Sequence, residues 1–84
     1  MKNTLNYVKI GQQAKIDSLN CTGSIRRRLL DLGLVKNTKI TPLFKSASGD
    51  PTAYEIRGSV IALREEDSKL ISVFDQGNIV FSKI

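Results

Sequence analysis

The sequence predicts a small all-β protein, a barrel of five to six short strands with one α-helix. Residues 26–34 read RRRLLDLGL, which is typical of a short amphipathic helix closed by a glycine. Residues 49–51 read Gly-Asp-Pro and form a tight turn, and residues 53–64 read as two strands joined at Gly58-Ser59. One helix and tightly turned strands within 84 residues favour a barrel, because closure of the sheet removes unpaired strand edges.

The N-terminal part of the chain predicts one helical turn and then a strand. Leu5 and Val8 are three residues apart, which suits a single helical turn within residues 3–12. Residues 14–19 follow as the first expected strand, where Ile16 lies between two charged neighbours.

The helix is expected from about Ser24 to Leu32. At 100° per residue, Ile25, Leu29 and Leu32 share one face, which we expect to face the core. Gly33 is the expected left-handed residue after the helix, and Leu34 is expected to fold back as the apolar contact of that cap.

The remaining segments complete the expected barrel. Residues 38–45 read as a strand in which Pro42 predicts a sheet edge or a bulge, because proline has no N–H to donate. Residues 65–69 suit one helical turn and residues 70–74 a further strand. The sequence thus predicts a single domain over residues 1–84, an SH3-like barrel with a core at 10–74 and the helix between its first and second strands. Residues 75–84 are expected to form an extension, with a turn at 75–78 and an extra strand at 79–84.

Composition indicates a compact, non-secreted protein. The net charge of +5 suits an anionic partner, and it also suits the ordinary solubility of a small domain. Cys21 is the only cysteine, so the fold does not depend on an internal disulfide, which favours the cytosol. No segment resembles a signal peptide or a membrane span, so we expect no direct membrane insertion.

Residue types argue against catalysis, a bound cofactor and a resident metal. The chain has no histidine and one cysteine, whereas a zinc-type site needs several such ligands. Nucleophilic catalysis lacks an imidazole base. The run Glu65-Glu66-Asp67 is better explained as the acidic first turn of a helix. We therefore predict no enzyme activity, no cofactor and no metal site.

The arginine run Arg26-Arg27-Arg28 is the remaining candidate site. On a helix these three side chains spread around the axis, and few aromatic residues are available to stack on bases, so nucleic-acid binding is not expected. Leu30 lies about 140° from Ile25, outside the apolar stripe. It is either a contact to a neighbouring strand or an apolar docking point flanked by arginine, which suits protein recognition.

Together these segments resemble the FeoA family, the small ferrous iron transport proteins A. The resemblance covers residues 10–73 and rests on the joint order of its motifs. These are RRRLLDLGL at 26–34, Gly-Asp-Pro at 49–51, Arg57-Gly58 with Ala62-Leu63-Arg64, and Leu-Ile-Ser-Val at 70–73.

The resemblance implies an SH3-like barrel that acts in the cytoplasm as a non-enzymatic accessory protein of ferrous iron uptake. Its implied partner is FeoB, a membrane GTPase and iron permease, which would place the chain at the inner face of the membrane. The candidate contact residues combine the helix with the loop that precedes residue 52; they are Arg26, Arg27, Leu30, Gly49, Asp50 and Pro51.

Three alternatives stay open at this point. The chain is a basic barrel that binds nucleic acid, a FeoA-like regulatory module of an iron-dependent repressor system, or an iron sensor or carrier that shares ligands with a partner. The absence of a helix-turn-helix ahead of the motifs favours the transport role over the repressor module.

Overall fold

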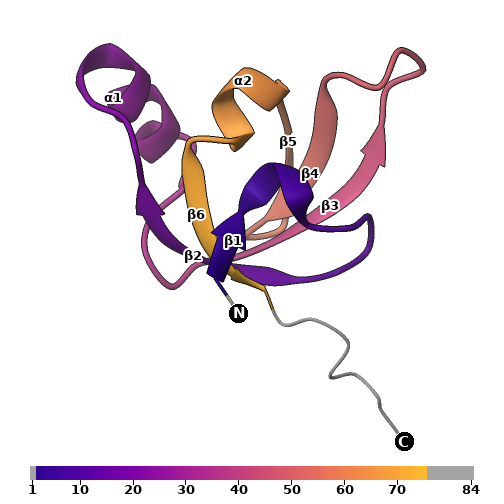
Figure 1. Ribbon diagram of the computed structural model, residues 1–84, viewed down its shortest axis with the longest axis horizontal. Helices are drawn as coiled ribbons and strands as arrows, with labels where there is room; N and C mark the ends of the chain where they lie inside the picture. Colours follow the sequence, from indigo (N-terminus) through magenta and orange to yellow (C-terminus); the bar gives the residue numbers. More distant parts are fainter. Residues whose placement is uncertain (1, 76–84) are drawn as a thin grey trace, which may run out of the picture.

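The computed structural model describes residues 2–75, which form one curled antiparallel sheet with two helices along its rim (Figure 1). The strand order is β1-β6-β2-β3-β4-β5, so β1 and β5 are the sheet edges within the described residues and the barrel is open between them. The strands are β1 (Lys2–Thr4), β2 (Ala14–Leu19), β3 (Lys39–Lys45), β4 (Thr52–Ile56), β5 (Ser59–Leu63) and β6 (Ile71–Asp75). The two helices are α1 (Gly23–Asp31) and α2 (Glu65–Ser68), and the 3₁₀ turn η1 (Leu5–Tyr7) follows β1.

The predicted all-β class with five to six strands and one main helix is confirmed, and the strand β1 was missed. β1 is three polar residues long and pairs with β6 through Lys2 opposite Phe74 and Thr4 opposite Ser72. A segment this short and polar has no period of its own, so only its partner makes it a strand. Because β1 comes first, α1 lies between the second and third strands of the chain.

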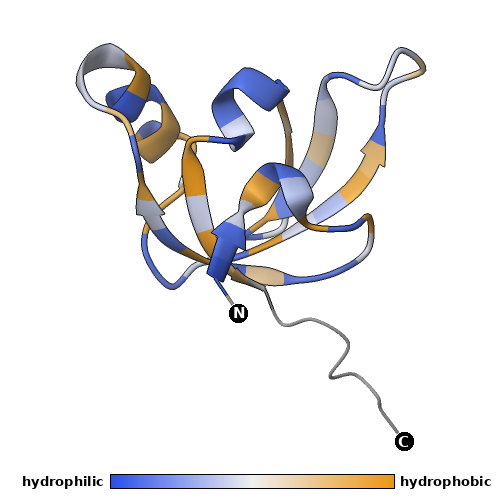
Figure 2. Ribbon diagram, in the orientation of Figure 1, coloured by the Kyte–Doolittle hydropathy of each residue, from blue (hydrophilic) through white to orange (hydrophobic). Residues whose placement is uncertain are grey.

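The core is the inner surface of the curled sheet, closed at its ends by η1 and α1. Apolar and polar residues alternate along β2 and β6, whereas β1 and α2 are hydrophilic (Figure 2). The buried cluster draws on every element except β1 and α2; it comprises Leu5, Val8, Ala14, Ile16, Leu29, Leu34, Ile40, Tyr54, Ile56, Leu63, Ile71 and Val73. Seven of these residues, among them Leu5, Leu29 and Leu34, have 0% exposure.

Pro42 lies in a bulge. Its strand β3 is internal, between β2 and β4, so the edge alternative does not apply. The register between β3 and β4 shifts between Pro42 and Phe44, where the missing proline N–H requires no ladder partner.

Helix α1 is held to the core by two leucines, which corrects the predicted apolar face. Leu29 is fully buried, whereas Ile25 and Leu32 are 43% and 39% exposed. Gly33 has φ +97°, and Leu34, also fully buried, returns its N–H to the Leu29 carbonyl at 3.1 Å. The helix lies over the rim of the sheet, so only one position of its stripe reaches the interior, and the chain after Gly33 supplies the second anchor.

The other expected elements are confirmed where the structure describes them. The single turns at η1 and α2 are present, and so is the hairpin between β4 and β5. Its turn is Arg57-Gly58, one residue before the expected Gly58-Ser59, because Ser59 already pairs with Ile56. The turn expected over 75–78 and the strand expected over 79–84 lie outside the described residues, except for Asp75, which is the last residue of β6 and not part of a turn.

Candidate functional site

Helix α1 brings three of the predicted contact residues together. Arg26, Arg27 and Leu30 line an open hollow of about 650 Å³ on the solvent face of α1, which we call the outer hollow. Gly23, Ser24 and Asp31 complete its lining. This grouping follows from helical geometry, because positions 23, 26, 27 and 30 lie on one side of a helix.

A second hollow of about 290 Å³ adjoins the first, and we call it the inner hollow. It lies between α1, strand β2 and the turn after Gly33. Its lining residues are Ile16, Asp17, Ser18, Leu19, Arg26, Leu30, Leu34, Val35 and Lys36. Arg26 and Leu30 line both hollows, and Leu30 is 38% exposed, so it forms a ridge between them.

The arginines of α1 have three different environments. An Nη1 hydrogen of Arg26 is donated to the Leu19 carbonyl at 3.2 Å, which ties the start of the helix to the end of β2. Arg27 is exposed and forms no ion pair with any described residue. Arg28 pairs with Asp67 of α2 at 3.1 Å and so links the two helices. Two of the three side chains, Arg26 and Arg27, therefore keep charge available at the hollows.

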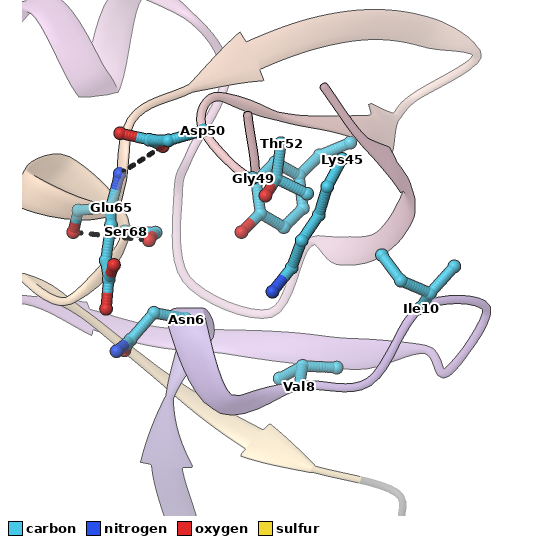
Figure 3. Close-up of a pocket in the computed structure, with 10 residues that line it drawn as sticks. Asn6, Val8, Ile10, Lys45, Gly49, Asp50, Thr52, Glu65 and Ser68 are labelled. Atoms are coloured by element: carbon cyan, nitrogen blue, oxygen red, sulfur yellow. Dashed lines mark hydrogen bonds between the residues drawn. The ribbon is translucent and has the colours of Figure 1, made fainter. Parts of the chain in front are cut away.

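The loop half of the predicted contact surface lies elsewhere. Gly49 and Asp50 line a small polar pocket of about 60 Å³ at the mouth of the barrel (Figure 3). In Figure 3 the ammonium group of Lys45 points into this pocket, with Val8 and Ile10 on one side and Thr52 on the other. The other lining residues are Asn6, Tyr54, Glu65 and Ser68. The volume suits a few water molecules, and the lining carries both charge signs.

The Gly-Asp-Pro turn has a structural role. Gly49 has φ +94°, which a glycine adopts without strain. Asp50 accepts a hydrogen bond from the N–H of Glu65 at 3.0 Å, so its carboxylate fixes the first turn of α2. The hydroxyls of Ser46 and Ser48 donate to the Asp50 carbonyl at 2.7 and 3.0 Å. Pro51 follows in this turn and does not line the pocket.

Helix and loop do not share a hollow in the described part of the chain. α1 and the loop between β3 and β4 lie on opposite sides of α2 (Figure 1). The predicted surface therefore divides into two separate places, of which α1 is the larger and more open.

The sequence did not reveal the inner hollow. Leu34 and Ile16 were expected to be buried, but nothing local indicates that they form the base of a cavity together with Leu19 and Val35. The two segments involved, 16–19 and 30–36, meet only in the folded chain, so no motif spacing encodes their contact.

The buried tyrosine of the small pocket offers no base or nucleophile. Burial raises the pKa of Tyr54 above its ordinary 10.0, although side-chain hydrogen bonds with Ser68 and Thr52 oppose the shift. Its phenol therefore stays protonated at neutral pH and acts as a hydrogen-bonding group.

The same part of the chain forms neither a metal-binding cluster nor a membrane-spanning helix. Residues 2–75 contain no group of three or more His, Cys, Asp or Glu side chains placed to hold a metal ion. No helix formed by these residues is long and apolar enough to cross a membrane.

A short, curled six-stranded sheet with a basic and apolar helix on its rim defines a small SH3-like domain. The model of the FeoA domain matches residues 3–74, and the chain belongs to the FeoA family of ferrous iron transport proteins. It is 34% identical over 70 residues to the "Putative Fe(2+) transport protein A" of Campylobacter jejuni, with 83% of this chain and 95% of the relative covered.

Solved structures agree with this assignment. The FeoA-like protein of Clostridium acetobutylicum superposes with a TM-score of 0.83 at 29% identity, over 99% of this chain and 93% of the other. FeoA of Stenotrophomonas maltophilia, described as a prokaryotic SH3 domain protein in complex with zinc, gives a TM-score of 0.75 at 27% identity. That match covers 83% of this chain and 87% of the other.

Proposed function

We propose that this chain is a non-enzymatic accessory protein of ferrous iron uptake that acts by protein–protein contact with a FeoB-type membrane GTPase and iron permease. Membership of the FeoA family and the relative described as an Fe(2+) transport protein support the iron transport role. The proposed place of contact is the cytoplasmic face of the membrane, as the resemblance to the FeoA family implies.

The observation that carries the proposed contact is the exposed ridge of α1. Leu30 is 38% exposed between two hollows and is flanked by the charged side chains of Arg26 and Arg27. Arginine is enriched in protein–protein interfaces, and the buried core of such an interface is more apolar than its rim. The small pocket at the barrel mouth is less suited to this role, because only about 60 Å³ of it is accessible.

The residue types and polar contacts of the chain support a role without catalysis. The chain has no histidine, and Tyr54 keeps its proton at neutral pH. The ion pair of Arg28 with Asp67 and the hydrogen bond from Glu65 to Asp50 fix α2 in place. These polar contacts have a structural role, because they hold α2 against α1 and against the loop before β4.

Binding to the transporter's purified cytosolic domain tests the proposal. We expect Leu30→Glu to weaken binding at least tenfold, because a carboxylate replaces the apolar anchor at the centre of the contact. Ile25→Glu is the matched control, since Ile25 lies on the same helix, is 43% exposed and lines neither hollow. It should bind like the unchanged chain.

Circular dichroism establishes that both variants are folded before binding is compared. If folded Leu30→Glu binds like the unchanged chain, the α1 surface is excluded. If the unchanged chain binds neither the cytosolic domain nor the full-length transporter in detergent, the proposed function itself is wrong.

A further inference from the structure

The inner hollow has the composition of a socket for one large apolar side chain. Ile16 and Leu34, which are 1% and 0% exposed, lie at its base. Leu19, Leu30 and Val35 are partly exposed and supply apolar walls. Its volume of about 290 Å³ is open to solvent at the surface of the protein and has no covering element among the described residues.

The rim of this socket carries a fixed guanidinium group. The hydrogen bond from Arg26 to the Leu19 carbonyl, at 3.2 Å, holds the side chain beside the hollow and uses one of its five donors. The remaining donors include a pair with the fork geometry that binds a carboxylate. Because the group is already held in place, little side-chain entropy is lost when a carboxylate binds.

The charges around the socket favour an acidic occupant. Asp17 lines the hollow, but the ammonium group of Lys2 pairs with its carboxylate at 3.0 Å and offsets its charge. The side chain of Asp17 is only 13% exposed. Lys36 adds a second cation at the rim, and Arg27 adds a third beside the outer hollow. The outer hollow contains one acid, Asp31, which forms no ion pair with any residue in the range 2–75. The balance is therefore positive.

We propose that the inner hollow binds an acidic segment of the partner, with one large apolar side chain inserted beside Leu30 and a neighbouring carboxylate paired with Arg26. This inference rests on the proposed function, because the segment belongs to the cytosolic part of the transporter. It adds the chemistry of the contact: an apolar anchor next to Asp or Glu, with the partner's carboxylate contributing the salt-dependent part of the affinity.

The test compares the full-length chain and three variants for binding to the transporter's cytosolic domain at 50 and 500 mM NaCl. Arg26→Gln should weaken binding about tenfold at low salt, as expected for a lost charge-assisted hydrogen bond. It should also flatten the salt dependence, since the screened interaction is gone. Arg26→Lys should be intermediate, because an ammonium group keeps the charge and loses the fork. Arg64→Gln removes an exposed arginine that lines neither hollow, and it should bind like the unchanged chain.

The outcomes separate this inference from the proposed function. Tight binding by the unchanged chain with no difference between Arg26→Gln and Arg64→Gln would overturn the acidic socket and leave the transporter contact intact. No binding by the unchanged chain would remove both. If Arg26→Gln weakens the binding of a single-stranded oligonucleotide as much as it weakens binding of the cytosolic domain, the site is a general polyanion patch and the inference is overturned.

Discussion

Leu29→Ala is the substitution that best tests how α1 is attached to the sheet. The side chain of Leu29 is fully buried, so its truncation removes apolar contacts and leaves a cavity. The expected loss in the free energy of unfolding is about 3 kcal/mol, within the range of roughly 2–5 kcal/mol for buried leucine. Leu32, at 39% exposure, loses only part of its transfer free energy and leaves no sealed cavity, so Leu32→Ala should cost about 1 kcal/mol.

Urea unfolding followed by circular dichroism at 222 nm measures both losses. For a domain of this size the slope is about 1 kcal/mol per molar urea, so Leu29→Ala should lower the midpoint by about 3 M and Leu32→Ala by about 1 M. If the Leu29→Ala chain has no folded baseline, Leu29→Val at a cost of about 1 kcal/mol provides the comparison. Equal losses at Leu29 and Leu32 would refute the structure's account of α1 and restore the predicted stripe.

The Arg28–Asp67 ion pair, the glycine after α1 and the buried Tyr54 each predict a change in stability. In a double-mutant cycle, Arg28→Ala and Asp67→Ala should show a coupling of about 0.5–1 kcal/mol at low salt, reduced in 1 M NaCl, because Arg28 is largely solvated; additive losses would mean that the pair contributes nothing. Gly33→Ala should cost about 1–2 kcal/mol, since φ is +97° and the nearest atom to an added Cβ, Ile56 Cδ1, is 4.0 Å away, so the cost is backbone strain without a clash. Urea unfolding of Gly33→Ala with no loss of stability would contradict this. Burial raises the pKa of Tyr54, so the native state holds the phenol proton more tightly than the unfolded chain; stability is complete below pH 10 and falls as the pH rises through the native pKa. Tyr54→Phe should remove that component, and melting temperatures of the two chains that fall in parallel between pH 9 and 11 would argue against it.

Much of the fold was predictable because it is encoded locally. The Gly-Asp-Pro turn, the β4–β5 hairpin and the Gly33 cap each depend on residues that adopt special backbone conformations, and the sequence displays them directly. The alternation in residues 14–19 gave the bounds of β2 without error, because one face of that strand is buried.

The predictions that were wrong concern features that depend on tertiary position. A helical wheel shows which residues share a side, and it does not show how much of that side reaches the core. On the rim of a curled sheet, Leu29 alone is covered, whereas Ile25 and Leu32 remain at the surface. β1 was missed for the complementary reason, since three polar residues become a strand only because β6 lies beside them.

The sequence predicted how one half of the candidate residues is grouped, whereas their role in binding stays a prediction. The grouping of Arg26, Arg27 and Leu30 follows from helical spacing, and the structure places all three at one hollow. Their separation from Gly49 and Asp50 depends on α2, whose position between them is fixed by long-range bonds to Arg28 and Asp50. No local sequence pattern predicts the separation between the α1 residues and the Gly-Asp-Pro turn.

The position of β6 between β1 and β2 governs when this protein can acquire its shape. Among residues 2–75, β1 pairs only with β6, the last described strand along the chain: Lys2 lies opposite Phe74, and β6 also places Asp75 opposite Ala14 of β2. A ribosome must therefore release nearly the whole described segment before the opening residues have anything to pair with. Folding is then a late, cooperative event dominated by contacts distant in sequence, and a prematurely terminated polypeptide would lack the strand that joins the two ends.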